Sequence, residues 1–316
     1  MKILVTGGAG FIGSNLVPHL AKLGHDVVVL DNLSGGQDAP AFPESVEFRH
    51  GDFLDWALLS ECLAGVEVVV HLAAKTGVID SIADPVGCFT CNVEGTFRLL
   101  ETTRHAKIKH FVNASTGGAI LGDATPPISE AMAPAPLSPY GASKLATEGF
   151  CSAYFGSYGL PCASLRFSNI YGPKSAHKKS VVAAFIKRAL NDEPLVIYGD
   201  GTQQRDYLYV GDLARGIAAV IEHQANGTFQ LGSGRPTSVV ELVQALASTT
   251  GSRLNIEHQQ ARKGEVYSTW CDITKARDAF GYVVRTALAA GLRETWDWFA
   301  TNQPSWRQKK ILTAAD

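Results

Sequence analysis

The 316-residue chain has little of what marks a membrane protein or a nucleic-acid-binding protein. Its 28 basic and 30 acidic residues leave a formal net charge of −2, and no long block carries one sign. Bulk electrostatics therefore do not predict nucleic acid as a partner, and a small molecule is the better expectation. No apolar run approaches the roughly 18 residues that a membrane-spanning helix needs. We expect no membrane partner and a cytoplasmic location.

Cysteine offers neither a disulfide framework nor a metal site. The six cysteines show no regular spacing, and a chain of this size in a reducing compartment does not need disulfides. Cys88 and Cys91 form the only C-x-x-C pair, and they fall within a helix predicted over Val86–Thr102. Because no second Cys or His pair lies near them in the sequence, we expect packed free thiols and no bound metal.

The N-terminus carries the most informative pattern. An apolar strand pattern over Lys2–Thr6 runs directly into the glycine-spaced turn Gly7–Gly13, and an amphipathic helix pattern follows. In such a strand–turn–helix unit, Gly7 permits the tight turn, Gly10 lets the backbone approach phosphates, and Gly13 allows close packing of helix and strand. The pattern predicts that a dinucleotide pyrophosphate binds at the N-terminus of the helix.

An acidic residue at the end of the next strand bears on the choice of dinucleotide. The apolar segment Val27–Leu30 ends at Asp31, near the position where a carboxylate accepts hydrogen bonds from the adenosine ribose hydroxyls. The same carboxylate would repel a 2′-phosphate, and residues 32–37 contain no Arg or Lys to compensate. We therefore predict NAD as the cofactor in preference to NADP.

Short apolar segments alternate with helical patterns in the first half of the chain. They are Lys2–Thr6, Asp26–Leu30, Ser45–Arg49, Glu67–Leu72, His110–Ala114 and Pro161–Phe167. This alternation predicts an α/β fold with a Rossmann-type doubly wound parallel sheet. Ligands of such sheets bind beyond the carboxyl ends of the strands, so residues from four strand ends should line one crevice. These residues are Asp31, Asp52, His71–Ala74, Ser115 and Thr116.

The pattern loosens after about residue 170, where prolines and glycine clusters separate shorter helices and strands. With 46% hydrophobic residues, the chain can bury the core of one large domain or of one and a half. We predict an NAD-binding domain over residues 1–170, to which some later segments return. A smaller C-terminal α/β lobe over residues 171–316 should mainly bind the substrate.

A second motif supplies candidate chemistry. Ser138 and Pro139 are typical of a helix start, and the helix that follows puts Tyr140 and Lys144 four residues apart on one face. A phenol is a poor base at neutral pH, but a neighbouring ammonium group and a positively charged nicotinamide both favour the phenolate. Tyr140 is therefore expected to take a hydroxyl proton while hydride leaves the same carbon.

With these motifs in order, the chain resembles the extended short-chain dehydrogenase/reductase family. Within it, the chain is similar to the nucleotide-sugar 4-epimerases of the UDP-glucose 4-epimerase type and to their dehydratase and decarboxylase relatives. The motifs that carry the resemblance are Thr6–Gly13, Asp31–Ser34, Gly51–Phe53, His71–Ala74, Asn92–Thr96, Tyr140 with Lys144, and Leu165–Pro173. They span most of the chain.

The resemblance implies a set of cofactor-binding residues. Asp52 and Phe53 would bracket the adenine, the backbone of Ala73 and Ala74 would border the cofactor, and Lys144 would hold the nicotinamide ribose. The full implied set is Gly7, Gly10, Phe11, Ile12, Gly13, Asp31, Asn32, Asp52, Phe53, Leu72, Ala73, Ala74, Asn92, Tyr140, Lys144 and Phe167.

The resemblance also assigns the second half to a nucleotide-sugar substrate. Arg205 and Arg262 would clamp its diphosphate, a task that suits the two parallel hydrogen bonds of a guanidinium group, and Asn169 would donate to the same diphosphate. Glu265 would accept from the nucleoside ribose. The basic residues Lys174, His177, Lys178 and Lys179 follow as a loop that could approach phosphates or an acidic sugar, and a solvated lysine face is the favoured interpretation.

The segment Asn113–Gly122 distinguishes among the family's reactions. Dehydratases and decarboxylases of this family place an acidic residue there, and this chain has none. A C4 epimerase needs only reversible hydride transfer, so this reaction is the prediction. Many epimerases have a Ser or Thr where this chain has Gly117, so we expect Thr116, and next Ser115, to donate to the sugar O4 and relay its proton.

The sugar is less defined by the sequence. Thr269 falls where the family's pocket-gating residue lies, and its small side chain would admit N-acetylated sugars as well as glucose and galactose. Asn169 and Ala176 differ from the residues usual in UDP-glucuronate 4-epimerases, which remain an alternative together with a dehydratase, a reductase and a non-catalytic NAD-binding regulator. The resemblance implies a homodimer formed through the helix of Tyr140 and its neighbour.

Overall fold

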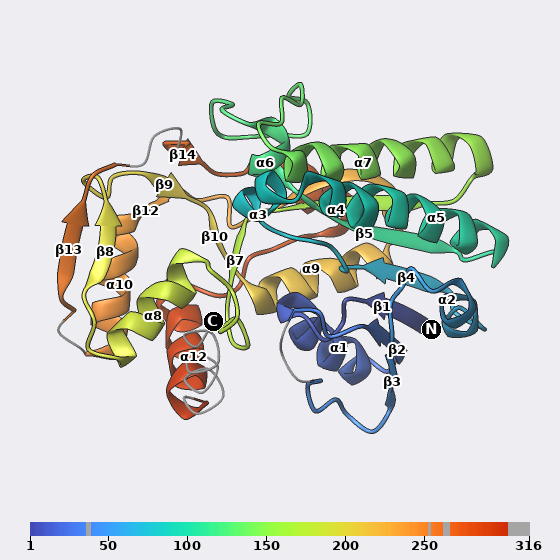
Figure 1. Cartoon of the computed structure of the whole chain (residues 1–316), viewed down its shortest axis with the longest axis horizontal. Helices are drawn as coiled ribbons and strands as arrows, with labels where there is room; N and C mark the ends of the chain where they lie inside the picture. The colour runs from blue at the N-terminus through green and yellow to red at the C-terminus, as the bar shows by residue number, and fades with distance from the viewer. Residues whose placement is uncertain (36–38, 252–253, 262–265, 303–316) are drawn as a thin grey trace.

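The computed structural model describes residues 1–35, 39–251, 254–261 and 266–302. In this part of the chain, seven parallel strands form the central sheet (Figure 1). Their order across the sheet is β11 (Gly227–Leu231), β6 (Cys162–Phe167), β5 (His110–Thr116), β4 (Val68–His71), β1 (Lys2–Thr6), β2 (Asp26–Asp31) and β3 (Val46–His50). The six strands predicted from the sequence all form, each within two residues of its expected ends, and the doubly wound parallel sheet is confirmed.

Helices cover both faces of this sheet. Successive residues of a strand point to opposite faces, and β1 shows the consequence clearly. Ile3 and Val5 pack into one core with α1 (Phe11–Lys22) and α9 (Val210–Glu222). Leu4 packs on the other side, in a core that includes residues of α2 (Trp56–Cys62), α5 (Gly95–His105) and α7 (Pro139–Tyr158). A strand buried on both faces is continuously apolar, as β1 is at Ile3, Leu4 and Val5.

The strand order reverses at β1, whose neighbours are β2 and β4. The chain leaves the sheet in opposite directions from this point, so a crevice opens beyond the carboxyl ends of these strands. The residues that follow β1, β2, β4 and β5 therefore meet at one edge, although they are up to 110 positions apart in the sequence.

The helix predicted over Val86–Thr102 forms, but with a wide turn in its middle. It consists of α4 (Pro85–Phe89), the π-helical segment η1 (Thr90–Glu94) and α5. The side chain of Asn92, in η1, accepts a hydrogen bond from the Lys75 amide at 2.8 Å and donates one to the Lys75 carbonyl at 2.9 Å. Such π-turns often occur at functional sites, and this one fixes the backbone that follows β4.

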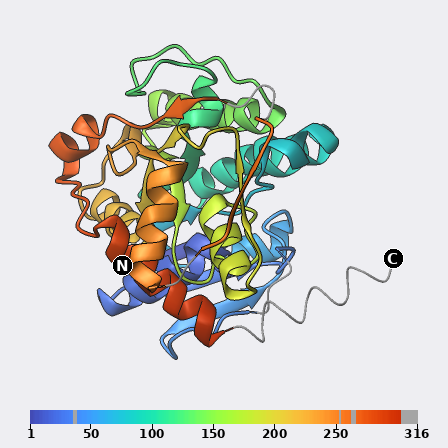
Figure 2. The ribbon, with the colours of Figure 1, turned by 90° about the vertical axis from the view of Figure 1, so that its left-hand side faces the viewer.

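The second half of the chain builds a smaller layer and also returns to the sheet. Its own core includes Phe185, Leu242 and Phe299. Figure 2 looks onto this side of the molecule. The remaining elements are α3 (Val78–Ala83), α6 (Gly117–Leu121), β7 (Asn169–Tyr171), α8 (Val181–Leu190), β8 (Leu195–Tyr198), β9 (Gln204–Arg205), β10 (Tyr207–Tyr209), β12 (Thr237–Ser238), α10 (Val239–Thr250), β13 (Ile256–Gln259), β14 (Ser268–Thr269), α11 (Thr274–Phe280) and α12 (Leu288–Thr301).

Two elements of this half, β11 and α9, belong to the central sheet and its covering layer. The division into domains at residue 170 stays a prediction. In the part of the chain that the structure describes, no helix is both long enough and apolar enough to cross a membrane.

His71, the last residue of β4, points into the interior between β1 and α5. Its two ring nitrogens lie 2.7 Å from Thr6 Oγ1 and 2.9 Å from Thr96 Oγ1, and the residue is 1% exposed. Burial lowers the pKa of His71 to about 3, and the Lys144 charge acts in the same direction. The folded protein therefore keeps this imidazole neutral, as a link between two strands and a helix.

The buried imidazole makes stability depend on pH. Below pH 6.5 the unfolded chain binds a proton at His71 that the folded chain excludes until about pH 3. Falling pH across this window should therefore lower the free energy of unfolding by up to about 1.4 kcal/mol per pH unit from this residue. In His71→Asn this slope should be smaller, as measured by urea unfolding at several pH values. The exposed His223, changed to Asn, is the control, and an equal slope in wild type and His71→Asn would contradict the assignment.

Candidate active site

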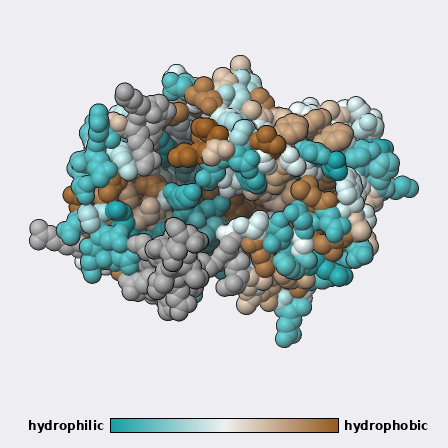
Figure 3. All heavy atoms as spheres, viewed as in Figure 1, coloured by the Kyte–Doolittle hydropathy of each residue, from teal (hydrophilic) through white to brown (hydrophobic). Residues whose placement is uncertain are grey.

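A cavity of about 820 Å³ lies at the carboxyl ends of β1, β2, β4 and β5. Figure 3 shows the molecular surface hollowed between the sheet and the smaller layer on the face seen in Figure 1. Most of the predicted cofactor residues line this cavity. They are Gly7, Gly10, Phe11, Ile12, Gly13, Asp31, Asn32, Asp52, Phe53, Leu72, Ala73, Ala74, Tyr140, Lys144 and Phe167.

The glycine turn is packed too closely for side chains. Gly7 has a positive φ of 71°, and a Cβ atom there would lie 2.5 Å from the Ala73 nitrogen. A Cβ atom on Gly13 would lie 2.4 Å from the Gly8 Cα. The turn can thus press against the end of β4 and against the start of α1. Gly10 caps α1 without a side-chain hydrogen bond, so the helix offers backbone amides to an anion, as a dinucleotide pyrophosphate requires.

Two carboxylates stand at the other end of this wall, after β2 and β3. Asp31 accepts hydrogen bonds from the Ala9 amide at 2.9 Å and from the Leu33 amide at 2.8 Å. Asp52 accepts from the Asn32 side chain at 2.8 Å. Each carboxylate oxygen can accept more than one hydrogen bond, so Asp31 is fixed by the backbone and still has acceptor capacity toward ribose hydroxyls. The arrangement fits an adenosine.

The helix α7 presents Tyr140 and Lys144 on the opposite wall. Ser138 caps this helix by accepting a hydrogen bond from the Gly141 amide at 3.1 Å, and Pro139 begins it, as the sequence predicted. The Tyr140 amide donates to Ser81 Oγ in α3 at 3.1 Å. Lys144 Nζ donates to the Ala114 carbonyl oxygen of β5 at 2.9 Å. The Lys144 side chain is thereby tied to the sheet, and the Tyr140 backbone is tied to α3.

Burial acts on both groups in the direction of neutrality. It raises the pKa of Tyr140 to about 12 and lowers the pKa of Lys144 to about 8. Each shift disfavours the charged form, because low-dielectric surroundings solvate a charge poorly. A positive charge in the cavity would favour the phenolate of Tyr140, and this is the electrostatic situation of a site that binds an oxidised nicotinamide.

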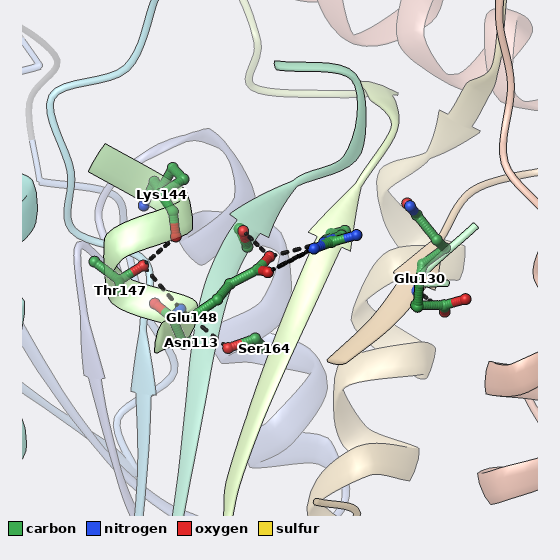
Figure 4. A network of polar contacts seen from close by, with 9 residues as sticks. Asn113, Glu130, Lys144, Thr147, Glu148 and Ser164 are labelled. Carbon is green, nitrogen blue, oxygen red and sulfur yellow. Dashed lines mark hydrogen bonds and ion pairs between the residues drawn. The ribbon is translucent and has the colours of Figure 1, made fainter. Parts of the chain in front are cut away.

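A buried ion pair lies behind Lys144, one helical turn further along α7 (Figure 4). Arg166 of β6 donates from Nη2 to Glu148 Oε2 at 2.8 Å and from Nε to Oε1 at 2.9 Å. Ser115 of β5 donates its hydroxyl to Glu148 Oε1 at 2.6 Å. The side chains of Arg166 and Glu148 are only 5% and 6% exposed. Glu148 therefore joins α7, β5 and β6, and it accepts the one hydrogen bond that the Ser115 hydroxyl can donate.

The two candidate hydroxyl groups differ in their availability. Ser115 borders the cavity, but its hydrogen bond to Glu148 already uses its proton. Thr116 caps α6 without a side-chain hydrogen bond, and its hydroxyl has no partner within the described ranges. Thr116 does not line the 820 Å³ cavity. The expectation that both residues line the crevice is therefore wrong for Thr116, and it is wrong also for the inward-pointing His71.

Gly117 shows why a hydroxyl side chain is missing at that position. A Cβ atom there would lie 2.6 Å from Oε1 of Gln230 and 3.1 Å from Cδ1 of Ile128. Gln230 is fully buried on β11, and its amide accepts from the Cys271 thiol at 3.5 Å. The space that a Ser or Thr side chain would need is therefore filled from the neighbouring side of the sheet.

The other predicted residues lie outside the cavity lining. Asn92 is buried and acts through the Lys75 backbone, as described above. Asn169 is exposed at the start of β7. Arg205 and Thr269 pair across β9 and β14, with Arg205 Nη1 donating to the Gln204 and Tyr267 carbonyl oxygens. Arg262 and Glu265 lie outside the described residues.

Several lining residues were not predicted. Thr76, Gly77 and Asp80 follow β4, and Thr90 and Cys91 belong to the π-helical turn. The basic loop also reaches the cavity through His177, Lys178, Lys179 and Ser180. The basic composition of this loop was the sequence feature that indicated a place at the cavity. The interpretation as a solvated face is wrong for Lys178, which is half-buried. Among the residues described, no three His, Cys, Asp or Glu side chains gather as metal ligands would.

Comparison with known proteins decides the family. The model of the NAD dependent epimerase/dehydratase family matches residues 3–232. The chain belongs to this family. The resemblance stated from the motifs is thereby confirmed, and so is NAD as the cofactor type, because the family is NAD dependent.

Individual members of the NAD dependent epimerase/dehydratase family are similar over nearly the whole chain. UDP-glucose 4-epimerase of Mycolicibacterium smegmatis is 38% identical, with 95% of this chain and 98% of the relative covered. UDP-glucose 4-epimerase of Thermotoga maritima, solved with UDP-glucose, is 36% identical at a TM-score of 0.91. The match covers 96% of this chain and 100% of the solved chain. UDP-glucuronic acid 4-epimerase of Bacillus cereus, solved with UDP-glucuronic acid and NAD, is 34% identical at a TM-score of 0.87. The match covers 95% of this chain and 99% of the solved chain.

The buried ion pair yields a prediction about stability. Glu148→Ala leaves the Arg166 guanidinium buried without its carboxylate, which should lower the free energy of unfolding by about 3 to 5 kcal/mol in urea denaturation. Glu47→Ala removes the partner of Arg49 from an exposed pair and should leave the free energy of unfolding nearly unchanged, because water screens that pair. A double change, Glu148→Leu with Arg166→Met, should be milder than Glu148→Ala. Equal losses for Glu148→Ala and Glu47→Ala would show that burial does not govern this pair.

Proposed function

We propose that the chain is an NAD-dependent epimerase that inverts C4 of a UDP-sugar, such as UDP-glucose or UDP-N-acetylglucosamine. The observation that carries the proposal is the placement of Tyr140 and Lys144 on the wall of the cavity that the glycine turn also lines. A hydroxyl-activating pair and a dinucleotide cradle thus share one space. The similarity to UDP-glucose 4-epimerases over 95% of the chain supports the same reaction.

The residues present fit NAD. The amides at the start of α1 would hold the pyrophosphate, Asp31 the adenosine ribose, and Phe53 with Asp52 the adenine edge. Lys144 would hold the nicotinamide ribose. NAD, when bound, supplies the hydride acceptor and donor that a C4 inversion needs. The close packing of the turn at Gly7 against Ala73 lets the backbone lie against a phosphate.

Tyr140 is proposed as the group that takes and returns the proton of the sugar O4. Its pKa of about 12 in the protein alone is too high for this work at neutral pH, and a cation in the cavity lowers it toward the useful range. An oxidised nicotinamide would supply such a charge, and Lys144 stands one helical turn away from Tyr140. Its hydrogen bond to the Ala114 carbonyl fixes the ammonium group in that place.

Thr116 is proposed as the hydroxyl donor to O4, and Ser115 as a structural residue. The support is the distribution of hydrogen bonds, since Glu148 occupies Ser115 while Thr116 is unengaged within the described ranges. The same comparison disfavours elimination chemistry. The segment Asn113–Gly122 holds no carboxylate, and Glu148 behind it is neutralised by Arg166. A dehydratase would need an available acid or base there.

The substrate contacts remain proposals. Arg205 and Thr269 are neighbours on β9 and β14, so a nucleotide sugar along this small sheet would meet both. A Cβ atom on Gly118 would lie 3.3 Å from Thr269 Cγ2, which places Thr269 against the segment that follows Thr116. A small residue at this point suits an N-acetyl group. Asn169, Arg262 and Glu265 complete the proposed set of substrate-binding residues.

A cytoplasmic location of the protein stays a prediction.

The assigned base can be tested by Tyr140→Phe. Loss of the phenol oxygen should reduce turnover by at least about 100-fold, the lower range for general acid–base groups, while NAD stays bound. The assay follows the sugar anomeric protons by NMR with UDP-glucose, UDP-N-acetylglucosamine or UDP-glucuronate and no added NAD. Formation of the galacto isomer by wild type identifies the substrate. Activity of Tyr140→Phe equal to wild type would remove Tyr140 from the mechanism.

A homodimer through α5 and α7 is proposed from the apolar side chains on these helices. Phe97, Phe155 and Tyr158 are large and exposed, with Tyr158 56% accessible. Phe97 and Tyr158 both contact the ring of Tyr154, at centroid distances of 6.2 Å and 5.1 Å, so they form one aromatic group across the two helices. An exposed aromatic surface of this kind is typical of an interface between subunits.

Charge placed on this surface should separate the subunits. Wild type is expected at twice the single-chain mass of 33.7 kDa in sedimentation equilibrium, and Phe155→Glu with Phe97→Glu at the single-chain mass, because a desolvated carboxylate opposes association. Leu23→Glu, at an exposed apolar residue that follows α1, is the matched control and should remain dimeric. A wild-type protein that sediments as a monomer would overturn the proposed dimer.

A further inference from the structure

The loop from Lys174 to Ser180 runs from the glycine-turn side of the cavity, beside α1, to the start of α8 in the smaller layer. Lys174 Nζ donates to the Ser14 carbonyl oxygen at 2.8 Å, and Asn15 Nδ2 donates to the Pro173 carbonyl oxygen at 3.1 Å. Further along, Lys179 forms an ion pair with Asp80 at 3.3 Å. The loop thus has contacts near both ends, and its residues 177–180 lie on the cavity wall.

The lysines that line the cavity differ in what they contact. Lys75 is paired with Asp84 at 2.7 Å, and Lys179 with Asp80. Lys144 donates to the Ala114 carbonyl oxygen beside Tyr140. Lys178 has only a neutral partner within the described ranges, the Thr76 hydroxyl at 3.4 Å. It is therefore the lysine of this cavity whose charge is matched neither by a carboxylate nor by the catalytic pair.

Lys178 is also half-buried, although a lysine without a carboxylate is ordinarily solvated. Burial lowers the pKa of its ammonium group. An unpaired cation held in such a place costs stability unless a ligand supplies the opposite charge. Lys178 contacts Thr76, and the chain runs on from Thr76 to Ser81, whose hydroxyl accepts from the Tyr140 amide at 3.1 Å. Lys178 thus stands on the wall that leads to Tyr140.

We infer that Lys178 binds an anionic oxygen of the nucleotide-sugar substrate, and this inference rests on the proposed function. The oxygen belongs either to the sugar-proximal phosphate or to a C6 carboxylate on the sugar. Both present the negatively charged acceptor that the loop lacks, and a lysine binds either as a point charge. In the first case Lys178 contributes to binding of every UDP-sugar, and in the second it selects uronates.

The test compares Lys178→Met with Lys179→Met by isothermal titration with UDP, UDP-glucose, UDP-glucuronate and NAD. Lys179→Met is the matched control, because it removes a neighbouring charge that is exposed and already paired. Lys178→Met should lower the affinity for the ligand whose anionic oxygen Lys178 binds by about tenfold or more, as loss of a charge-assisted hydrogen bond predicts. Lys179→Met should change the affinity for the same ligand by less than about threefold. Lys178→Arg should recover most of the loss, and thermal unfolding checks that each variant is folded.

The ligands separate the two sources of charge. Equal weakening of UDP, UDP-glucose and UDP-glucuronate assigns Lys178 to the phosphate, and weakening of UDP-glucuronate alone assigns it to the carboxylate. Unchanged affinity for all three, a loss confined to NAD, or an equal loss in Lys179→Met would overturn the inference. Because the readout is binding, a wild type that binds UDP-sugars without converting them refutes the proposed reaction and still decides the role of Lys178. A wild type that binds none of them refutes both.

Discussion

The ion pair between Glu148 and Arg166 is the interaction on which the α7 side of the cavity depends. It joins α7 to β6, and through the Ser115 hydroxyl it joins both to β5. Glu148 stands one helical turn beyond Lys144, which itself stands one turn beyond Tyr140, so a single face of α7 carries the proposed proton acceptor at one end and its anchor at the other. A charge pair with few exposed atoms is costly to break and tolerates little displacement. The helix therefore cannot rotate without losing the pair.

The opposite wall of the cavity depends on a different constraint, which is the absence of side chains. The Gly7 turn lies so close to Ala73 that any Cβ atom would collide with backbone. Close packing at this point brings the ends of β1 and β4 together and turns the amides of α1 toward the cavity. One wall is thus held by charge and the other by contact between backbones. Both are rigid, as the alignment of a hydride acceptor with a proton acceptor requires.

The electrostatics of the cavity also follow from this arrangement. Burial favours neutral forms of Tyr140, Lys144 and His71, so the protein alone is poorly set for proton abstraction. His71 remains neutral throughout the physiological range and serves only to connect elements. Tyr140 and Lys144 instead respond to charge brought in by a ligand. Such a site couples the basicity of the phenol to the presence of the oxidised cofactor.

The sequence by itself determined the sheet, the glycine turn and the helix start at Ser138, because each is specified by neighbouring residues through strand periodicity, glycine spacing and helix capping. Only the tertiary structure decided the state of individual side chains. In the folded chain the Ser115 hydroxyl donates to Glu148, 33 positions away, and Gln230 fills the space beside Gly117. His71 points into the interior, and Lys178 lies on the cavity wall. These contacts join residues from different strands and loops, and a local pattern does not encode which distant side chain will satisfy a given hydroxyl, ammonium or amide group.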